Sequence, residues 1–116
     1  TTRKRSQDSF SRVFMDIVDN ADRMQELVDA SYPALHLHAR RFNLYQRLDY
    51  MLHVPISQMN GGNTFYRNVI RYLRRHIRDT IRNPYLTRKN KGYLLLLTAA
   101  PKTVRKIHRQ KMRLRE

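Results

Sequence analysis

The chain has 116 residues, carries a formal net charge of +15 and contains no cysteine. Its length allows one domain, the lack of cysteine excludes disulfides, thiolate metal sites and cysteine nucleophiles, and no apolar run approaches the ~18 residues that span a membrane. A folded domain with this charge is expected to have an acidic partner. Nucleic acid is the usual one, although an acidic protein or an anionic membrane surface would also serve.

The charge is distributed unevenly along the chain. Residues 6–32 have a net charge of −4, whereas residues 50–116 carry +14. We therefore predict two parts. Residues 1–33 form a basic N-terminal arm and an acidic amphipathic helix, and residues 34–116 form a helical bundle with a basic C-terminal extension. The start at Thr1 is expected to reflect processing or trimming of a longer chain.

The first predicted helix is acidic and amphipathic. It is expected to begin at Asp8 or Ser9, both good N-cap residues, and to end before Pro33, because the residue preceding a proline disfavours helix. Acidic residues occupy much of its outer surface. The expected inward stripe has helical spacing and consists of Phe10, Phe14, Ile17, Ala21, Met24 and Val28, with Val13 and Leu27 beside it.

A second helix is predicted from Ala34 to about His53. Its inward stripe consists of Leu37, Leu44, Leu48 and Met51, and arginines are expected at the stripe's edges, namely Arg40, Arg41 and Arg47. Residues 54–63 are predicted to be a loop, because the sequence Asn-Gly-Gly-Asn at 60–63 is a strong turn signal. Asn63 or Thr64 is expected to cap the next helix.

The third helix is predicted to run without interruption from Phe65 to Asn83, where Pro84 ends it. Its inward stripe consists of Tyr66, Val69, Ile70, Leu73, Ile77, Thr80 and Ile81. Its outer face is expected to carry one continuous ridge of arginines, formed by Arg67, Arg71, Arg74, Arg78 and Arg82, with Arg75 beside it. Asp79 is the only acid in this segment, so the ridge creates a high local positive potential.

A fourth helical segment is predicted to begin near Thr87, and its apolar run Tyr93–Leu97 is expected to be largely buried. Pro101 either interrupts or kinks this segment, or starts a new helix with proline in its first turn. No segment shows the sustained alternation of a strand. The sequence therefore predicts an all-α fold, a bundle of three or four helices with basic terminal extensions.

Two basic features are candidates for nucleic-acid contact: the arginine ridge and the C-terminal run. Guanidinium groups stay charged and bind phosphates with paired hydrogen bonds. The predicted phosphate contacts are Arg67, Arg71, Arg74, Arg75, Arg78, Arg82, Lys102, Arg105, Lys106, Arg109, Lys111 and Arg113. The alternatives are a solvated helix face for the ridge and a localisation signal for the C-terminal run.

Other site chemistry has little support in the sequence. Five histidines invite a metal-site interpretation, but no carboxylate cluster accompanies them, and the spacing of His36 and His38 puts these two on different faces of a helix. No nucleophile–base arrangement, paired carboxylates or phosphate-binding glycine loop is visible. We therefore expect no enzyme activity, no metal site and no intrinsic cofactor.

Three segments together resemble a known family. Residues 43–48 read Asn-Leu-Tyr-Gln-Arg-Leu, which is similar to the Leu-Tyr-Arg signature that opens LYR-motif proteins, with Gln46 in place of the signature Arg. Residues 74–83 read Arg-Arg-His-Ile-Arg-Asp-Thr-Ile-Arg-Asn and resemble the arginine-rich second helix of that family. The leucines of 94–97 would supply the leucine-rich third helix. The resemblance covers residues 40–112.

This resemblance implies a small basic three-helix protein of the mitochondrial matrix. Many LYR proteins bind the mitochondrial acyl carrier protein, whose acyl chain enters the bundle while its acidic helix meets basic residues. The acyl-phosphopantetheine of that partner would then be the cofactor present in the complex. By similarity, the candidate contacts are Tyr45, Arg47, Arg71, Arg74, Arg75 and Arg78. Family members serve in respiratory complex I, in complex assembly, in iron–sulfur biogenesis and in mitoribosome assembly.

The sequence as a whole predicts a non-catalytic subunit or assembly factor of a large mitochondrial assembly. The ribosome is favoured, because +14 over residues 50–116 exceeds what docking one acidic carrier needs. The basic residues would hold rRNA phosphates with little base readout, while the acidic helix faces a neighbouring protein. The alternative is an accessory subunit of respiratory complex I that binds acyl carrier protein and anionic lipid head groups. A free-standing nucleic-acid-binding module, such as a transcription factor, ranks third.

Overall fold

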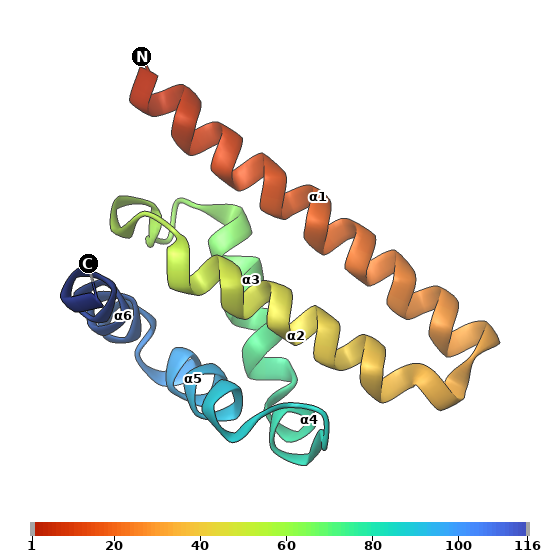
Figure 1. Ribbon diagram of the computed structural model, residues 1–116. Helices are drawn as coiled ribbons and strands as arrows, with labels where there is room; N and C mark the ends of the chain where they lie inside the picture. Colours follow the sequence, from red (N-terminus) through yellow and green to blue (C-terminus); the bar gives the residue numbers. More distant parts are fainter. Residues whose placement is uncertain (1, 116) are drawn as a thin grey trace.

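A computed structural model gives the conformation of the chain and describes the backbone of residues 2–115 and the side chains of residues 12–113. Over residues 2–115 the structure is built of helices and contains no strand (Figure 1). The helices are α1 (Thr2–Ser31), α2 (His36–His53), α3 (Thr64–Arg75), α4 (Ile77–Arg82), α5 (Arg88–Ala99) and α6 (Pro101–Arg115), with short 3₁₀ turns at Pro33–Leu35 and Ile56–Gln58. The predicted all-α class is confirmed.

Helix α2 lies at the centre of the fold and contacts each of the other α-helices. Figure 1 shows α1 lying along one side of α2, with the other helices on the opposite side. The core around α2 is made of aliphatic and aromatic side chains, among them Leu44, Leu48, Tyr50, Met51, Val69, Leu73, Leu94, Leu97 and Val104. Because α2 is covered on several sides, its buried residues extend beyond a single stripe and include the polar Asn43 and Arg47. Leu37, predicted to face inward, is exposed near the start of α2.

Helix α1 begins earlier than the capping pattern predicted, at Thr2 instead of Asp8 or Ser9, and ends at Ser31 before the proline, as predicted. Its inward face overlaps the predicted stripe, in which Phe14, Ile17, Met24 and Val28 are half-buried, but the most buried positions lie slightly to one side of that stripe. Val18 and Gln25 are buried, and Val13 and Leu27 are exposed. Ala21 is buried as predicted, while the predicted inward position of Phe10 lies outside the described side chains.

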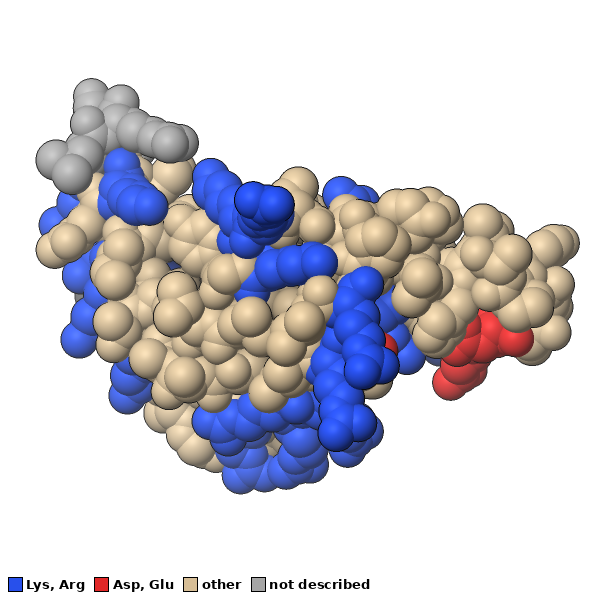
Figure 2. Space-filling view, turned by 90° about the horizontal axis from the view of Figure 1, so that it is seen from below, with Lys and Arg blue, Asp and Glu red and all other residues tan. Residues whose placement is uncertain are grey.

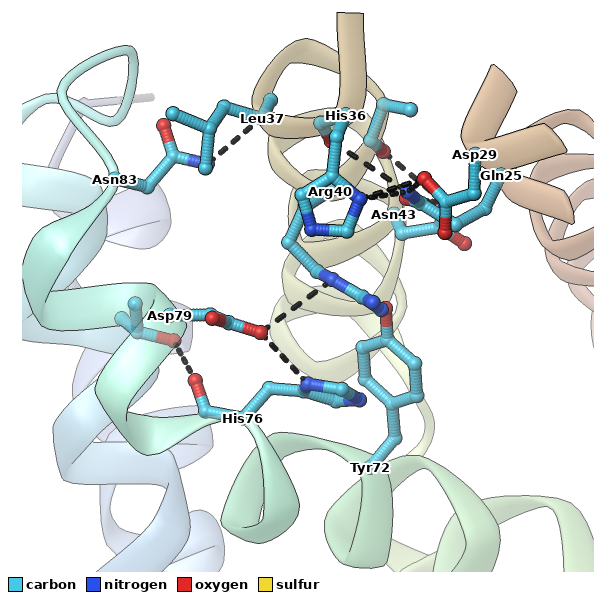
Figure 3. A network of polar contacts seen from close by, with 12 residues as sticks. Gln25, Asp29, His36, Leu37, Arg40, Asn43, Tyr72, His76, Asp79 and Asn83 are labelled. Carbon is cyan, nitrogen blue, oxygen red and sulfur yellow. Dashed lines mark hydrogen bonds and ion pairs between the residues drawn. The ribbon is translucent and has the colours of Figure 1, made fainter. Parts of the chain in front are cut away.

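Polar side chains join α1 to α2. The Asn43 amide donates to the Ala21 carbonyl oxygen at 3.0 Å. At the corner between the two helices, Gln25 donates to Asp29 at 2.9 Å, and the His36 ring lies 2.6 Å from the same carboxylate (Figure 3). These contacts position α1 against α2 through hydrogen bonds as well as apolar packing.

Turn and cap residues behave as predicted around residues 60–63. The Asn63 side chain accepts a hydrogen bond from the backbone N–H of Tyr66 at 3.2 Å, which caps α3. The Asn60 side chain accepts from the Gly62 N–H at 2.9 Å within the turn. Thr87 caps α5 in the same way, by accepting from the Asn90 N–H. Each cap satisfies a backbone donor that the helix leaves free.

The predicted uninterrupted third helix is wrong, because the chain leaves helical geometry at His76, with φ −108° and ψ 30°. The Asp79 carboxylate lies 2.9 Å from His76 Nδ1, and the Thr80 hydroxyl donates to the His76 carbonyl at 2.9 Å. Such side-chain bonds compete with regular helical pairing. The break reorients α4, so that Thr80 is 2% exposed whereas Ile81, predicted to face inward, is 54% exposed.

Pro101 starts a new helix, which was one of the predicted outcomes. The apolar run before it is less buried than predicted, because it lies on a helix and only one side of a helix faces the core. Leu94 and Leu97 are fully buried, but Leu96 is 58% exposed. No helix in the described part of the chain is both long enough and apolar enough to cross a membrane.

Candidate nucleic-acid interface

The predicted arginine ridge is divided between two helices. Arg67, Arg71 and Arg74 lie on α3 with Arg75 at its end, whereas Arg78 and Arg82 lie on α4. All six side chains are exposed. The ridge is therefore two adjoining groups of arginines instead of one straight line. Figure 2 shows Lys and Arg spread over much of the face seen from below, with Asp and Glu gathered mostly toward one end.

The one acid of this segment does not neutralise the ridge. Asp79 turns toward α2, where its carboxylate lies 3.5 Å from Arg40 Nε and 2.9 Å from His76 Nδ1 (Figure 3). Burial lowers the pKa of His76 below its usual value, partly offset by the hydrogen bond to Asp79. Among the described side chains, no carboxylate lies within 4.0 Å of any ridge arginine. The ridge thus keeps its full positive charge for an external anion.

Helix α6 carries the second predicted group of cations. Five of them are exposed, namely Lys102, Lys106, Arg109, Lys111 and Arg113. Arg105 is different, because its Nε donates to the Val54 carbonyl at 2.8 Å and its side chain is half-buried. Burial, assisted by the nearby positive charge of Arg109, lowers the pKa of Arg105. Arg105 attaches α6 to the end of α2 and offers less of its guanidinium to a phosphate than the others.

Arg47 does not occupy the surface position that the acyl-carrier contact needs. It is only 4% exposed. Its Nη2 donates to both carboxylate oxygens of Asp22 at 3.0 and 3.2 Å, its Nη1 donates to the Asn43 side-chain oxygen at 3.0 Å, and its guanidinium lies 3.5 Å from the centre of the Tyr72 ring. Because these partners come from α1, α2 and α3, Arg47 holds three helices together. The expected partner-binding role of Arg47 is corrected accordingly.

Tyr45, the tyrosine of the LYR-like segment, lies at the surface and is 41% exposed. The Arg41 guanidinium stands 5.7 Å from the centre of its ring. Tyr45 lines a small pocket of about 210 Å³ together with side chains of α2, α5 and α6, among them Leu52, Lys89 and His108. The remaining predicted carrier contacts, Arg71, Arg74, Arg75 and Arg78, belong to the α3–α4 surface described above.

A cleft runs along α3 toward the start of α6. It has a volume of about 390 Å³ and is lined by Tyr66, Arg67, Ile70, Arg71, Arg74 and Pro101. Three of the six lining residues are predicted phosphate contacts. The sequence did not identify Ile70 and Pro101 as part of a site, and it predicted Tyr66 mainly as an inward-facing residue. The spacing of Tyr66 and Ile70 indicates that they share one side of α3, but no sequence pattern brings Pro101 to that helix.

A second depression lies between α5 and α6 and is mostly apolar. This groove has a volume of about 480 Å³. Its apolar lining consists of Gly92, Tyr93, Leu96, Val104 and Ile107. Three cations also line it, namely Arg88, Lys89 and Lys111. The Lys111 ammonium lies 6.0 Å from the centre of the Tyr93 ring. The groove therefore combines an apolar surface with a basic border, and no Asp or Glu occurs in residues 80–115.

The histidines are engaged in local contacts. His36 lies beside Asp29, and the His38 ring stacks on Tyr85 with ring centres 3.8 Å apart. In the described part of the chain, no three His, Cys, Asp or Glu residues come together as metal ligands would.

The fold and this surface define a small, strongly basic, all-α protein with an anion-attracting face. Comparison with models of protein families, with curated proteins and with solved structures gives no match for this chain.

Proposed function

We propose that this chain is a non-catalytic helical subunit or assembly factor of a large mitochondrial assembly, and that it belongs to the mitochondrial ribosome, where it binds rRNA. One observation carries the proposal: eleven of the twelve predicted phosphate contacts are exposed, and none has a carboxylate within 4.0 Å among the described side chains. The positive charges over α3, α4 and α6 repel one another and destabilise the folded state unless an anionic partner covers them.

The proposed contact is electrostatic. Exposed arginines and lysines bind phosphate oxygens and release the counterions that the RNA had condensed. Such contacts fix the position of the protein without reading bases. The twelve cations lie on helices that share one core, so the folded protein presents them together and the cost of ordering them on binding is reduced.

Co-sedimentation tests this proposal. The native protein should sediment with ribosomal subunits, leave them at high salt, and be released by nuclease but not by mild detergent. High salt weakens each phosphate contact, and nuclease removes the partner itself. Co-purification with respiratory complex I that nuclease leaves unchanged would overturn the ribosomal proposal.

One feature favours a second function, an accessory subunit of complex I that docks acyl carrier protein. The groove between α5 and α6 offers an apolar surface bordered by cations, which would suit an acyl chain carried by an acidic protein. The LYR resemblance supports the same partner. Replacing Arg88, Lys89 and Lys111, the cations that border this groove, by Glu should abolish pull-down of the carrier, while the same change at Lys102, Lys106 and Arg109, which do not line the groove, should leave it intact. Binding that persists in the first variant would exclude this docking surface.

A further inference from the structure

The cleft along α3 holds its arginines in a defined arrangement before any ligand arrives. Arg67 Nη1 donates to the Gly61 carbonyl at 3.1 Å, and Arg74 Nε donates to the Thr98 carbonyl at 3.2 Å. Both side chains are thus tied to the backbone beside the cleft. Each bond uses one N–H of a guanidinium that has five, so most donors stay available.

Arg71 lies between these two anchored residues. The spacing of Arg67, Arg71 and Arg74 places the three on one side of α3, within two helical turns. Arg71 is exposed and makes no hydrogen bond or ion pair among the described residues. Three guanidinium groups therefore border one concavity, and the middle one is the least restrained.

The walls of the cleft favour strong electrostatic binding. Tyr66 and Ile70 are nearly buried, and Pro101 contributes a further apolar side chain. Apolar walls lower the local dielectric and strengthen a charge–charge contact. The volume of about 390 Å³ would hold roughly a dozen waters at ~30 Å³ each, which is room for a phosphate with its attached sugar.

We infer that this cleft is a preformed seat for one phosphate group of RNA, which fixes the register of the RNA on the otherwise diffuse basic surface. The inference rests on the proposed RNA contact and adds a particular site to it. Planar guanidinium groups bind phosphate oxygens in pairs, and their geometry here is set by the backbone contacts of Arg67 and Arg74. The other basic residues then add binding energy without setting position.

A matched pair of triple variants tests the seat. The first is Arg67→Gln, Arg71→Gln and Arg74→Gln. The control is Arg75→Gln, Arg78→Gln and Arg82→Gln, which removes the same charge from exposed side chains with no hydrogen bond or ion pair among the described residues. Fluorescence anisotropy with a single-stranded RNA should show that the first variant loses at least about tenfold more affinity than the control. Equal losses would overturn the seat and leave diffuse RNA binding standing.

A charge-conserving pair keeps the test valid if the triple variant folds poorly. Arg71→Lys keeps the positive charge but loses the fork that binds two oxygens. RNA affinity should fall several-fold in Arg71→Lys and stay unchanged in Arg23→Lys, an exposed position on α1 outside the proposed RNA contacts. If Arg71→Lys binds as tightly as the unmodified chain, the cleft is not a seat. Two RNAs, one with a 5′-hydroxyl and one with a 5′-phosphate, then show which phosphate of the RNA occupies the cleft. If it is the terminal phosphate, Arg71→Lys should weaken binding only of the 5′-phosphorylated RNA. If it is an internal phosphate, the variant should weaken binding of both RNAs equally.

A small anion separates failure of the seat from failure of the RNA proposal. Pyrophosphate should raise the thermal unfolding midpoint of the unmodified chain and have a smaller effect on Arg71→Gln, because a ligand that binds only the folded state stabilises it. If pyrophosphate behaves in this way but RNA does not bind, the seat stands and the ribosomal proposal fails. If pyrophosphate stabilises both proteins equally, the seat fails.

Discussion

At the scale of single residues, the buried Arg47 is a polar group that links three helices. Its guanidinium meets the Asp22 carboxylate, the Asn43 side chain and the face of the Tyr72 ring. The Asp22 side chain is 48% exposed, so the ion pair keeps access to water on one side. This exposure reduces the cost of desolvating the carboxylate and lets the pair contribute to stability.

Replacing Arg47 by Met should lower the free energy of unfolding by about 2–4 kcal/mol. The change removes charge-assisted hydrogen bonds and a cation–π contact, and it leaves the buried Asn43 oxygen without its donor. The matched control is Arg75→Met, an exposed position where the effect should stay within about 0.5 kcal/mol. Urea unfolding followed by circular dichroism measures both. If the two variants lost equal stability, Arg47 would not be holding the helices together.

Sequence patterns could not predict these buried polar residues. Arg47 stands at the edge of a stripe in which the burial of Leu44, Leu48 and Met51 was predicted correctly. The burial of Arg47 itself depends on α1 crossing that edge and presenting Asp22. Asn83 is fully buried, and its amide is satisfied by donating to the Leu37 carbonyl at 2.9 Å, across 46 residues of sequence (Figure 3). Periodicity reports which side of a helix is apolar, but not which distant helix supplies a polar partner.

At the scale of helices, local signals determine where each element begins, and the Asn63 cap can be tested directly. Asn63→Ala should lower the free energy of unfolding by about 1 kcal/mol, because it leaves the Tyr66 N–H unsatisfied at the start of α3. Asn68→Ala is the control: this exposed residue inside α3 should gain a few tenths of a kcal/mol from the higher helix propensity of Ala. Thermal or urea unfolding should therefore show changes in the free energy of unfolding that are opposite in sign for the two variants. If Asn63→Ala left the free energy of unfolding unchanged, the assigned cap would be contradicted.

Helix α6 contains a group whose protonation opposes its packing. Burial lowers the pKa of His108 below its usual value of 6.5, and the nearby His53 and Arg105 lower it further. His53 faces His108 with ring centres 5.4 Å apart, and Asp49 lies 3.2 Å from His53. The folded state therefore favours neutral His108. In the unfolded chain, by contrast, this residue takes up a proton near its usual pKa.

Stability should fall as the pH drops through about 6.5, because the unfolded state then binds more protons at His108 than the folded state. In His108→Gln, the free energy of unfolding should fall less between neutral and mildly acidic pH than in the unmodified chain. The difference should be only a fraction of the ~1.4 kcal/mol that one pKa unit represents, because the His108 ring is partly solvated. His38→Gln, at an exposed ring in α2, is the control. Unfolding curves between neutral and mildly acidic pH provide the measurement, and identical slopes in both variants would exclude a role for His108. Burial also lowers the pKa of His76. His76 should therefore preserve part of the pH dependence of stability in His108→Gln.

The two helix breaks show which boundaries a sequence reveals. Pro101 can be seen in the sequence, and its restricted backbone starts α6 where a break was expected. The break at His76 has no proline or glycine to mark it, and the apolar spacing continues through it. It depends on Asp79 and Thr80 bonding to His76 while Asp79 also meets Arg40 of α2. The ridge residues were therefore predictable as exposed cations, whereas their division between two helices was not.

At the scale of the whole molecule, the acids are arranged so that they leave the basic face unneutralised. Asp22 binds Arg47, Asp29 contacts His36, and Asp79 binds Arg40, so these carboxylates pair with residues of α2. The exposed acids Asp16, Asp19 and Glu26 lie on α1, which is on the opposite side of α2 from the other helices (Figure 1). Net charge alone would give a uniform field, but this arrangement concentrates positive potential on one part of the surface.

Location, and not only total charge, should therefore control RNA binding. Arg109→Gln with Arg113→Gln removes two charges from α6, and Arg12→Gln with Arg23→Gln removes two from α1, so both variants have the same net charge. Single-stranded RNA binding measured over a range of salt should become less salt-dependent in the α6 variant, with the slope of log K against log salt reduced by about 1.4, because each lost phosphate contact removes ~0.7. The α1 variant should keep the slope of the unmodified chain. Equal changes in both would mean that RNA senses only the net charge, and the basic face formed by α3, α4 and α6 would then lose its assigned role.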